Sequence, residues 1–174
     1  MSIEEQCSRW VESMVVGLNL CPFAKRSIDN QGVRYHIFED PLETLADAII
    51  EELQLLDSDP RIETTLFVIG KGLEDFMDYL DVLDGANQLL EAMDYEGTYQ
   101  IASFHPDYQF AGTEPDDVSN YTNRAPYPIF HFLREAALEN AIAAYGSDRA
   151  ARIPDNNIAR LDEMGLAKVK AYLK

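Results

Sequence analysis

Apolar residues at the start of the chain recur at the spacing of an amphipathic helix. Ser2 and Glu5 have the spacing of a capping box, and the apolar positions that follow lie on one helical face. The pattern predicts a helix over residues 3–18. Pro22 then disfavours helical dihedral angles at the preceding residue. We therefore expect Cys21 to lie in a turn.

The rest of the chain alternates between strand and helix patterns. Strand patterns occur at residues 33–38, 64–70 and 98–104. Helix patterns occur at residues 41–56, 73–93, from Pro126 or Pro128 to Ala144, and from Pro154 to the C-terminus. Such alternation favours crossover connections between parallel strands. The expected fold is a single α/β domain over residues 1–174, with a small, mainly parallel sheet of three or four strands flanked by helices. A fourth strand is expected at the edge, within residues 104–112.

The charge of the chain narrows the classes of partner. The sequence has 31 acidic and 14 basic residues, for a formal net charge of −17. Such a surface repels nucleic-acid phosphates and anionic lipids. The start, MSIEEQCSRW, lacks the regions of a signal peptide, and no segment approaches the roughly 18 apolar residues that span a bilayer. We expect a cytoplasmic protein without nucleic-acid or membrane partners.

Residues 101–128, IASFHPDYQFAGTEPDDVSNYTNRAPYP, largely lack helical or strand periodicity. Loops this long in compact domains are usually functional or disordered. In a structural interpretation, the aromatic rings form a small core and the polar side chains cap turns. In a functional interpretation the loop forms a site, because it leaves the carboxyl end of a strand, where open α/β sheets bind ligands.

Several long motifs occur in order along the chain: WVESMVVGLNLCPFAK, QIASFHPDYQFAGT, DDVSNYTNRAPYP followed by HFLRE, and NIARLDEMG. From about Trp10 to Gly165, the chain resembles the bacterial family catalogued as domain of unknown function 1415. The resemblance implies no particular reaction or cofactor. It implies a family pattern that includes Cys21, Lys25, His105, Asp107, Asp116, Asp117, Asn120, Asn123, Arg124, His131 and Arg134. The pattern has Ser at the position of Ala125, which argues against an essential hydroxyl there.

One hypothesis takes Cys21 as a nucleophile and His105 as its base, oriented by Asp107 or by an asparagine. Basic residues after the cysteine turn favour the thiolate, which is the reactive form. The residues expected to bind substrate are Lys25, Tyr108, Asp116, Asp117, Asn120, Asn123, Arg124 and Arg134. The two arginines suit an anionic molecule. The hypothesis is a hydrolase or group transferase that acts on a small anionic metabolite, and it requires the cysteine turn and the loop to meet over one edge of the sheet.

Two other hypotheses remain open. In the first, a divalent cation is bound by His105, Asp107, Asp116 or Asp117, and His131, although this spacing matches no known ligand motif. A simpler role for His131 is a helical pair with Glu135. In the second, the protein is a non-catalytic interaction module with Tyr108, Phe110 and Tyr121 as anchors. Buried rings favour ligand binding, whereas outward-facing rings favour interaction.

Overall fold

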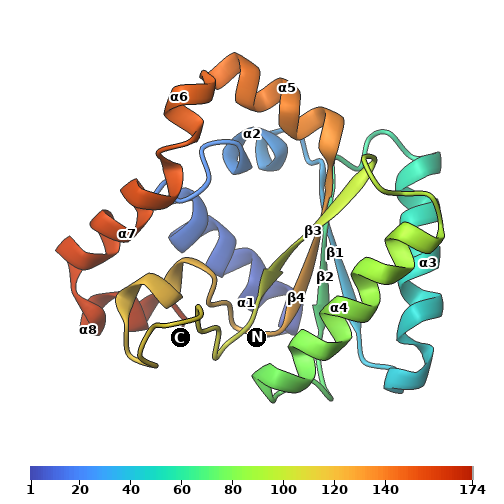
Figure 1. Cartoon of the computed structure of the whole chain (residues 1–174), viewed down its shortest axis with the longest axis horizontal. Coiled ribbons are helices and arrows are strands. Elements are labelled where there is room, and N and C mark those ends of the chain that lie inside the picture. The colour runs from blue at the N-terminus through green and yellow to red at the C-terminus, as the bar shows by residue number, and fades with distance from the viewer. Residues whose placement is uncertain (174) are drawn as a thin grey trace.

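A computed structural model describes residues 1–173. Its centre is a four-stranded sheet in the order β1-β2-β4-β3, with helices on both faces (Figure 1). The strands are β1 (Val33–Phe38), β2 (Thr64–Ile69), β3 (Tyr99–Phe104) and β4 (Ile129–Arg134). β1 and β2 are parallel, whereas β4 is antiparallel to both of its neighbours. The α/β class is confirmed, but the sheet is mixed and mostly antiparallel, so the expectation of a mainly parallel sheet is wrong.

The fourth strand lies where the sequence predicted a helix. Two prolines precede the segment IFHFLR, and proline commonly opens a helix. The aromatic and branched residues of the segment instead pair with β2 on one side and β3 on the other. The helix α5 (Glu135–Tyr145) begins directly after the strand. The expected helix is therefore wrong up to Arg134, and the fourth strand is central rather than at an edge within residues 104–112.

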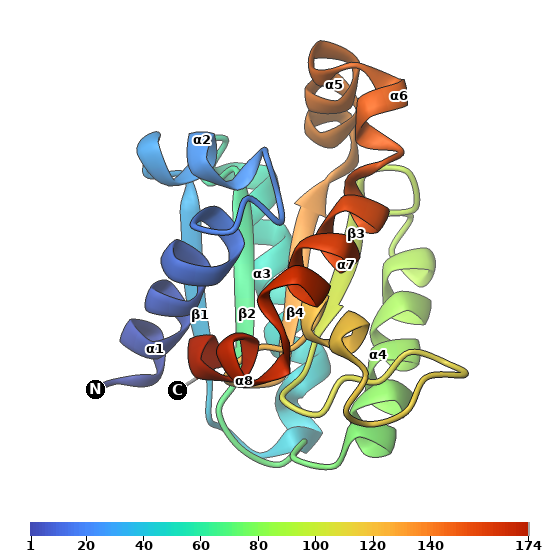
Figure 2. The same cartoon turned by 90° about the vertical axis from the view of Figure 1, so that its left-hand side faces the viewer.

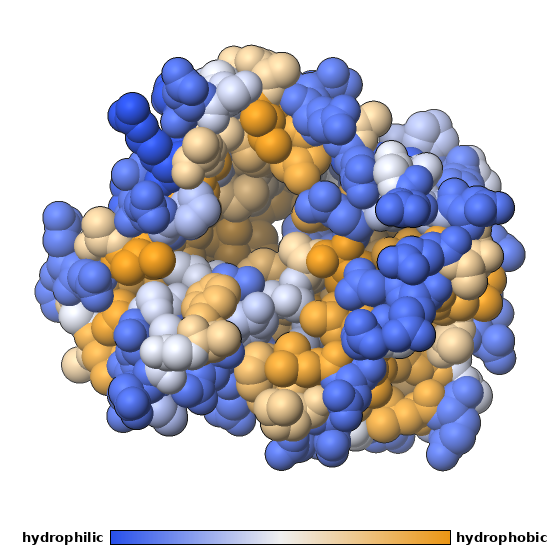
Figure 3. Space-filling model, viewed as in Figure 1, coloured by the Kyte–Doolittle hydropathy of each residue, from blue (hydrophilic) through white to orange (hydrophobic). Residues whose placement is uncertain are grey.

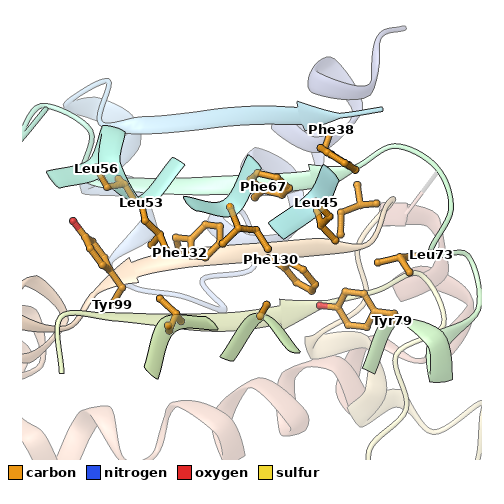
Figure 4. Packing of buried hydrophobic residues seen from close by; sticks show 14 residues of the cluster. Phe38, Leu45, Leu53, Leu56, Phe67, Leu73, Tyr79, Tyr99, Phe130 and Phe132 are labelled. Atoms are coloured by element: carbon orange, nitrogen blue, oxygen red, sulfur yellow. The ribbon is translucent and has the colours of Figure 1, made fainter. Parts of the chain in front are cut away.

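Two long helices cover one face of the sheet. A 3₁₀ turn (η2, Leu42–Thr44) leads into α3 (Leu45–Ser58), which connects β1 to β2, and α4 (Phe76–Ala92) connects β2 to β3. Their apolar residues pack on Phe67, Phe130 and Phe132 in one of the two core layers (Figure 4). These helices occupy the segments that the sequence predicted as helical.

The opposite face carries helices from both ends of the chain (Figures 1 and 2). The first helix, α1 (Ile3–Trp10), has the expected capping box and continues as a π-helical segment (η1, Val11–Val16). The remaining elements are α2 (Ala24–Asp29), a 3₁₀ turn η3 (Val118–Thr122), α6 (Ser147–Ala150), α7 (Ile153–Met164), α8 (Leu166–Val169) and η4 (Lys170–Leu173). Within residues 1–173, no helix has the length and apolar character needed to cross a membrane.

Candidate functional site

The long loop between β3 and β4 is held by its own polar side chains. Asn120 is fully buried. Its Oδ1 accepts hydrogen bonds from the backbone N–H of Phe110 at 2.9 Å and the hydroxyl of Thr113 at 2.8 Å. Its Nδ2 donates to the carbonyl of Glu114 at 2.9 Å. Asn123 donates to the carbonyl of the last-but-one residue of β3 at 3.1 Å. Both asparagines therefore have structural partners.

The charged residues of the loop also have protein partners. Arg124 donates from Nε to the carbonyl of Tyr108 at 3.1 Å and from Nη2 to that of Pro115 at 2.8 Å. Asp116 forms an exposed ion pair with Lys170 at 2.9 Å. The side chain of its neighbour, Asp117, caps η3. These contacts fix the loop and tie it to the C-terminal segment.

The aromatic rings of the loop form a small core. Tyr121 is buried, with 2% of its surface exposed, and Phe110 is 36% exposed. The ring of Tyr108 lies between Phe76 of α4, at 5.1 Å, and Phe110, at 5.0 Å. Most of this aromatic surface therefore faces the protein, as the structural interpretation of the loop expected, and Phe110 lies at the rim.

Two other predicted binding residues lie away from the loop. Arg134 donates to the carbonyls of Leu56 and Ile62, and so holds the chain that follows α3. Lys25 is exposed on α2 and pairs with Asp29 at 2.8 Å. The predicted cationic residues of the site are thus dispersed over three parts of the fold.

His105 lies in the core beside α4. It has no exposed surface, its Nε2 donates to the carbonyl of Leu73 at 3.0 Å, and its Nδ1 accepts from the backbone N–H of Asp107 at 3.0 Å. Its ring packs against Phe76 and Tyr79. Burial lowers the pKa of His105. Both ring nitrogens therefore bind protein groups.

Cys21 and His105 lie near opposite ends of the strands. The turn of Cys21 joins η1 to α2, which leads into β1, so it is near the amino-terminal ends of the parallel strands (Figure 2). The loop that starts at His105 leaves the carboxyl end of β3. Leu20, next to the cysteine, is buried on the α1 face. The structure does not bring Cys21 and His105 together, because they lie at opposite ends of the strands and on opposite faces of the sheet.

The residues of the metal hypothesis are also separated. His105 is in the core beside α4, and Asp116 is exposed beside Lys170. His131 lies in β4 and not in a helix, which also removes the helical pair with Glu135. Within residues 1–173, no group of three or more His, Cys, Asp or Glu side chains is arranged to hold a metal ion.

A cleft of about 240 Å³ lies where the cysteine turn meets α7. Asn157 of α7 donates to the carbonyl of Leu20 at 2.7 Å, and Arg160 donates to the carbonyl of Leu18. The lining of the cleft includes Asn19, Pro22, Tyr145, Asn156 and Arg160. Two of these residues closely flank Cys21 in the sequence. Amide groups, the guanidinium of Arg160 and the carboxylate of Glu163 give the cleft a polar lining.

The face of the sheet that packs against α1 is incompletely covered at β4. Phe130 and Phe132, which face α3 and α4, have no exposed surface. His131 and Leu133 alternate with them, face the other side and remain partly exposed, although β4 is a central strand. No residue of α5 is buried. A hollow with a largely apolar lining opens beneath α5 and α6 (Figure 3).

One ring nitrogen of His131 is hydrogen-bonded to the protein, and the other has no protein partner among residues 1–173. Its Nε2 is 2.7 Å from Oγ1 of Thr64, and that hydroxyl donates to the carbonyl of Phe132 at 2.6 Å. The hydroxyl proton is thus used, so Nε2–H donates to Thr64 and Nδ1 is unprotonated. Within residues 1–173, Nδ1 has no hydrogen-bond partner. Burial lowers the pKa of His131 to about 4, so the ring is neutral near pH 7.

The family model described as "Protein of unknown function (DUF1415)" matches residues 2–171 of the chain. The chain belongs to this family. No curated protein and no solved structure gives a significant match.

The motifs of this DUF1415 protein have two kinds of structural role. Residues of the motifs between 101 and 128 mainly order their own loop. The cysteine turn and His131 lie on the α1 face of the sheet, around α5 and α7. Sequence analysis missed the position of His131 because it assigned the segment to a helix. The dense aromatic and branched residues of IFHFLR are the signal that favours a strand.

Proposed function

We propose that this DUF1415 protein binds a small anionic molecule beside the cysteine turn and acts on it as a hydrolase or group transferase. In this proposal His131, rather than His105, is the base, and Cys21 is the nucleophile. The observation that carries it is the neutral imidazole of His131, whose Nδ1 is open on the uncovered part of a central strand.

The proposed base and nucleophile belong to the same face of the molecule. Leu66, the partner of His131 across the sheet, lies in the same apolar cluster as the residue before Cys21. Phe23, two residues after the cysteine, contacts Tyr145 at the end of α5, with ring centres 5.6 Å apart. The turn therefore lies beside the helix that follows the strand of His131.

Arg160 supplies the positive charge for an anionic molecule. It lines the cleft at the cysteine turn, and one of its nitrogens donates to the carbonyl of Leu18. A guanidinium has five N–H donors, so others remain for a carboxylate or phosphate. In this role Arg160 replaces Arg124, which holds its own loop, and Arg134, whose three donor nitrogens all bind protein groups.

The reaction class follows from these groups. A neutral imidazole accepts the proton of a thiol, and the resulting thiolate attacks an electrophilic carbon or phosphorus of the bound molecule. The bond from that atom to its leaving group breaks, and the imidazolium returns the proton to the leaving group. The covalent intermediate is then released by water or by an acceptor molecule, which distinguishes hydrolysis from group transfer.

Thiol labelling tests the pair of Cys21 and His131. Cys7 is fully buried and burial raises its pKa to about 12, so labelling of the folded protein reports Cys21. We expect His131→Gln to slow labelling at pH 7 by about tenfold or more, because a positioned base contributes at least this much. The control is His36→Gln, because His36 lies on the α3 face beside Glu52. Equal labelling rates in the wild type and His131→Gln would refute the pairing.

Thermal stabilisation by phosphate and by short dicarboxylates tests the anion site. A ligand that binds the folded state raises the melting temperature in proportion to its occupancy. We expect this stabilisation to be lost in Arg160→Gln and retained in Arg26→Gln, which removes an exposed charge from α2. A melting temperature that is insensitive to every anion contradicts this part of the proposal.

A further inference from the structure

The border of the sheet at β1 has free backbone groups. β1 is an outermost strand that pairs only with β2, and α1 lies beside it (Figure 2). The carbonyls of Gly32 and Phe38 accept hydrogen bonds from backbone N–H groups at the two ends of β2, so the even-numbered residues of β1 point to β2. Neighbouring residues of a strand point in opposite directions. The outward N–H and C=O groups are therefore those of Val33, Tyr35 and Ile37, and within residues 1–173 they have no backbone partner.

The other border of the sheet, at β3, is better covered. There the outward N–H of Tyr99 donates to the carbonyl of Tyr95 at 3.1 Å, and the outward carbonyl of Ser103 accepts from Asn123 at 3.1 Å. The six residues of β1 pair with β2 without a bulge, and they include no proline or lysine. Natural proteins commonly protect an edge strand with such features. A further strand can therefore pair at the β1 border.

The charged side chains of β1 lie on the α3 face. Arg34 donates to the buried carboxylate of Glu52 at 2.9 Å, and Nδ1 of His36 is 3.1 Å from the same carboxylate. The charges of Arg34 and Glu52 offset each other. Side chains of a strand project above and below the sheet, so these groups do not block the plane in which a further strand pairs.

The surroundings of β1 are acidic on the α1 face. Glu4 and Glu12 of α1 are exposed and take part in none of the ion pairs formed within residues 1–173. Both lie near Tyr35, because burial raises the pKa of its hydroxyl and these two carboxylates raise it further. Glu39 and Asp40, which are also exposed, follow the strand directly. A strand added at β1 is thus bordered by carboxylates.

We propose that the β1 border binds an extended, basic segment of a partner protein as an additional strand. The backbone of the segment pairs with the outward groups of β1, and its lysine or arginine side chains on the α1 face interact with Glu4 and Glu12. A second copy of this chain fits less well. Symmetric pairing of two β1 strands brings two sets of these carboxylates together, in proteins that each carry a net charge of −17. The surface shares no residue with the reaction proposed at the cysteine turn.

A short peptide, Lys-Val-Lys-Val-Lys-Val-Lys, tests the proposal on the full-length protein. One matched peptide has glutamate in place of every lysine, and a second keeps the lysines but is N-methylated along its central backbone. Binding is followed by NMR titration at low ionic strength, and backbone protection by amide hydrogen exchange. We expect the lysine peptide, at saturation, to slow exchange of the amides of Val33, Tyr35 and Ile37 by about tenfold or more. Both matched peptides should bind about tenfold more weakly or worse.

Variants of the protein separate charge from strand pairing. Replacing Glu4 and Glu12 together by glutamine should weaken binding of the lysine peptide about fivefold, whereas the matched control, Glu91→Gln with Glu139→Gln, removes two exposed charges elsewhere and should bind like the wild type. Val33→Pro removes one outward N–H at the first position of an edge strand, where proline is tolerated, and should also weaken binding about fivefold.

Three results would overturn the proposal. The first is a lysine peptide that gives no saturable response or leaves the outward amides of β1 unprotected. The second is equal binding of the lysine peptide and its N-methylated match, which would reduce the contact to charge alone. The third is a dimer in sedimentation that dissociates in Val33→Pro, which would assign the border to a second copy of the chain. These outcomes leave the thiol-labelling test of Cys21 unaffected.

Discussion

The imidazole of His131 should make the stability of the protein depend on pH. Burial lowers its pKa from 6.5 to about 4 in the folded protein. Between these two values, the unfolded chain binds a proton that the folded protein does not bind, so the free energy of unfolding decreases as the pH falls. The stabilising contribution is complete above about pH 6.5 and is lost progressively as the pH approaches about 4.

The size of this effect follows from the interval between the two pKa values. At about 1.36 kcal/mol for each pH unit, the interval corresponds to at most about 3.4 kcal/mol. Part of the ring of His131 contacts solvent, which screens the charge. We therefore expect a loss of about 2 kcal/mol in the free energy of unfolding between pH 7 and pH 4.5.

The measurement compares wild type with His131→Gln in urea unfolding at several pH values. Glutamine has an amide donor but does not titrate, so the variant should lack this part of the pH dependence. Carboxylates titrate in both proteins and cancel in the difference. Asn140→Ala, at an exposed position of α5 that does not titrate, is the control, and it should retain the wild-type pH dependence.

Two results would contradict a buried neutral imidazole. The first is an NMR titration in which the ring protons of His131 change near pH 6.5, which is practical because the chain has three histidines. The second is a free energy of unfolding whose pH profile is parallel in the wild type and in His131→Gln.

Two further predictions concern stability. Glu52 is 2% exposed and accepts hydrogen bonds from Arg34 and from the fully buried hydroxyl of Thr65. Glu52→Ala should therefore cost about 2–3 kcal/mol in urea unfolding, because it leaves the Thr65 hydroxyl without its acceptor and removes the partner of Arg34. The control is the exposed neighbouring residue, Glu51. Glu51→Ala should change the free energy of unfolding by less than about 0.5 kcal/mol. Asn120→Ala removes three hydrogen bonds of a fully buried amide and should cost about 2–3 kcal/mol. Asn140→Ala on exposed α5 is its control, and similar losses in the two asparagine variants would contradict the role of Asn120 in the loop.

Elements with local sequence signals could be predicted. The capping box of Ser2 and Glu5 defines the first helix, and three of the four strands occupy the expected segments. These features depend on residues close together in the chain. The direction and position of β4 depend on distant segments, so a short apolar run after proline does not distinguish a central strand from a helix.

The candidate site was less predictable for a similar reason. Asn120 and Arg124 have the residue types of a binding site, but their polar groups point to backbone atoms of their own loop. The types of residue in the loop do not reveal whether their polar groups point to the backbone or to solvent. His131 shows the opposite case, because its open nitrogen depends on whether other helices cover its strand. Residue type indicates possible chemistry, while the surrounding fold determines which atoms are available.

The position of β4 also affects synthesis of the protein. It is the last strand in the chain, yet it lies between β2 and β3, so the sheet is incomplete until residues beyond Arg134 have been translated. Until then, the facing edges of two earlier strands have no partner from the same chain. Unpaired edges promote association between nascent chains, and pairing over long sequence separations is slow. Premature termination after β3 should therefore yield fragments that require chaperones or are degraded.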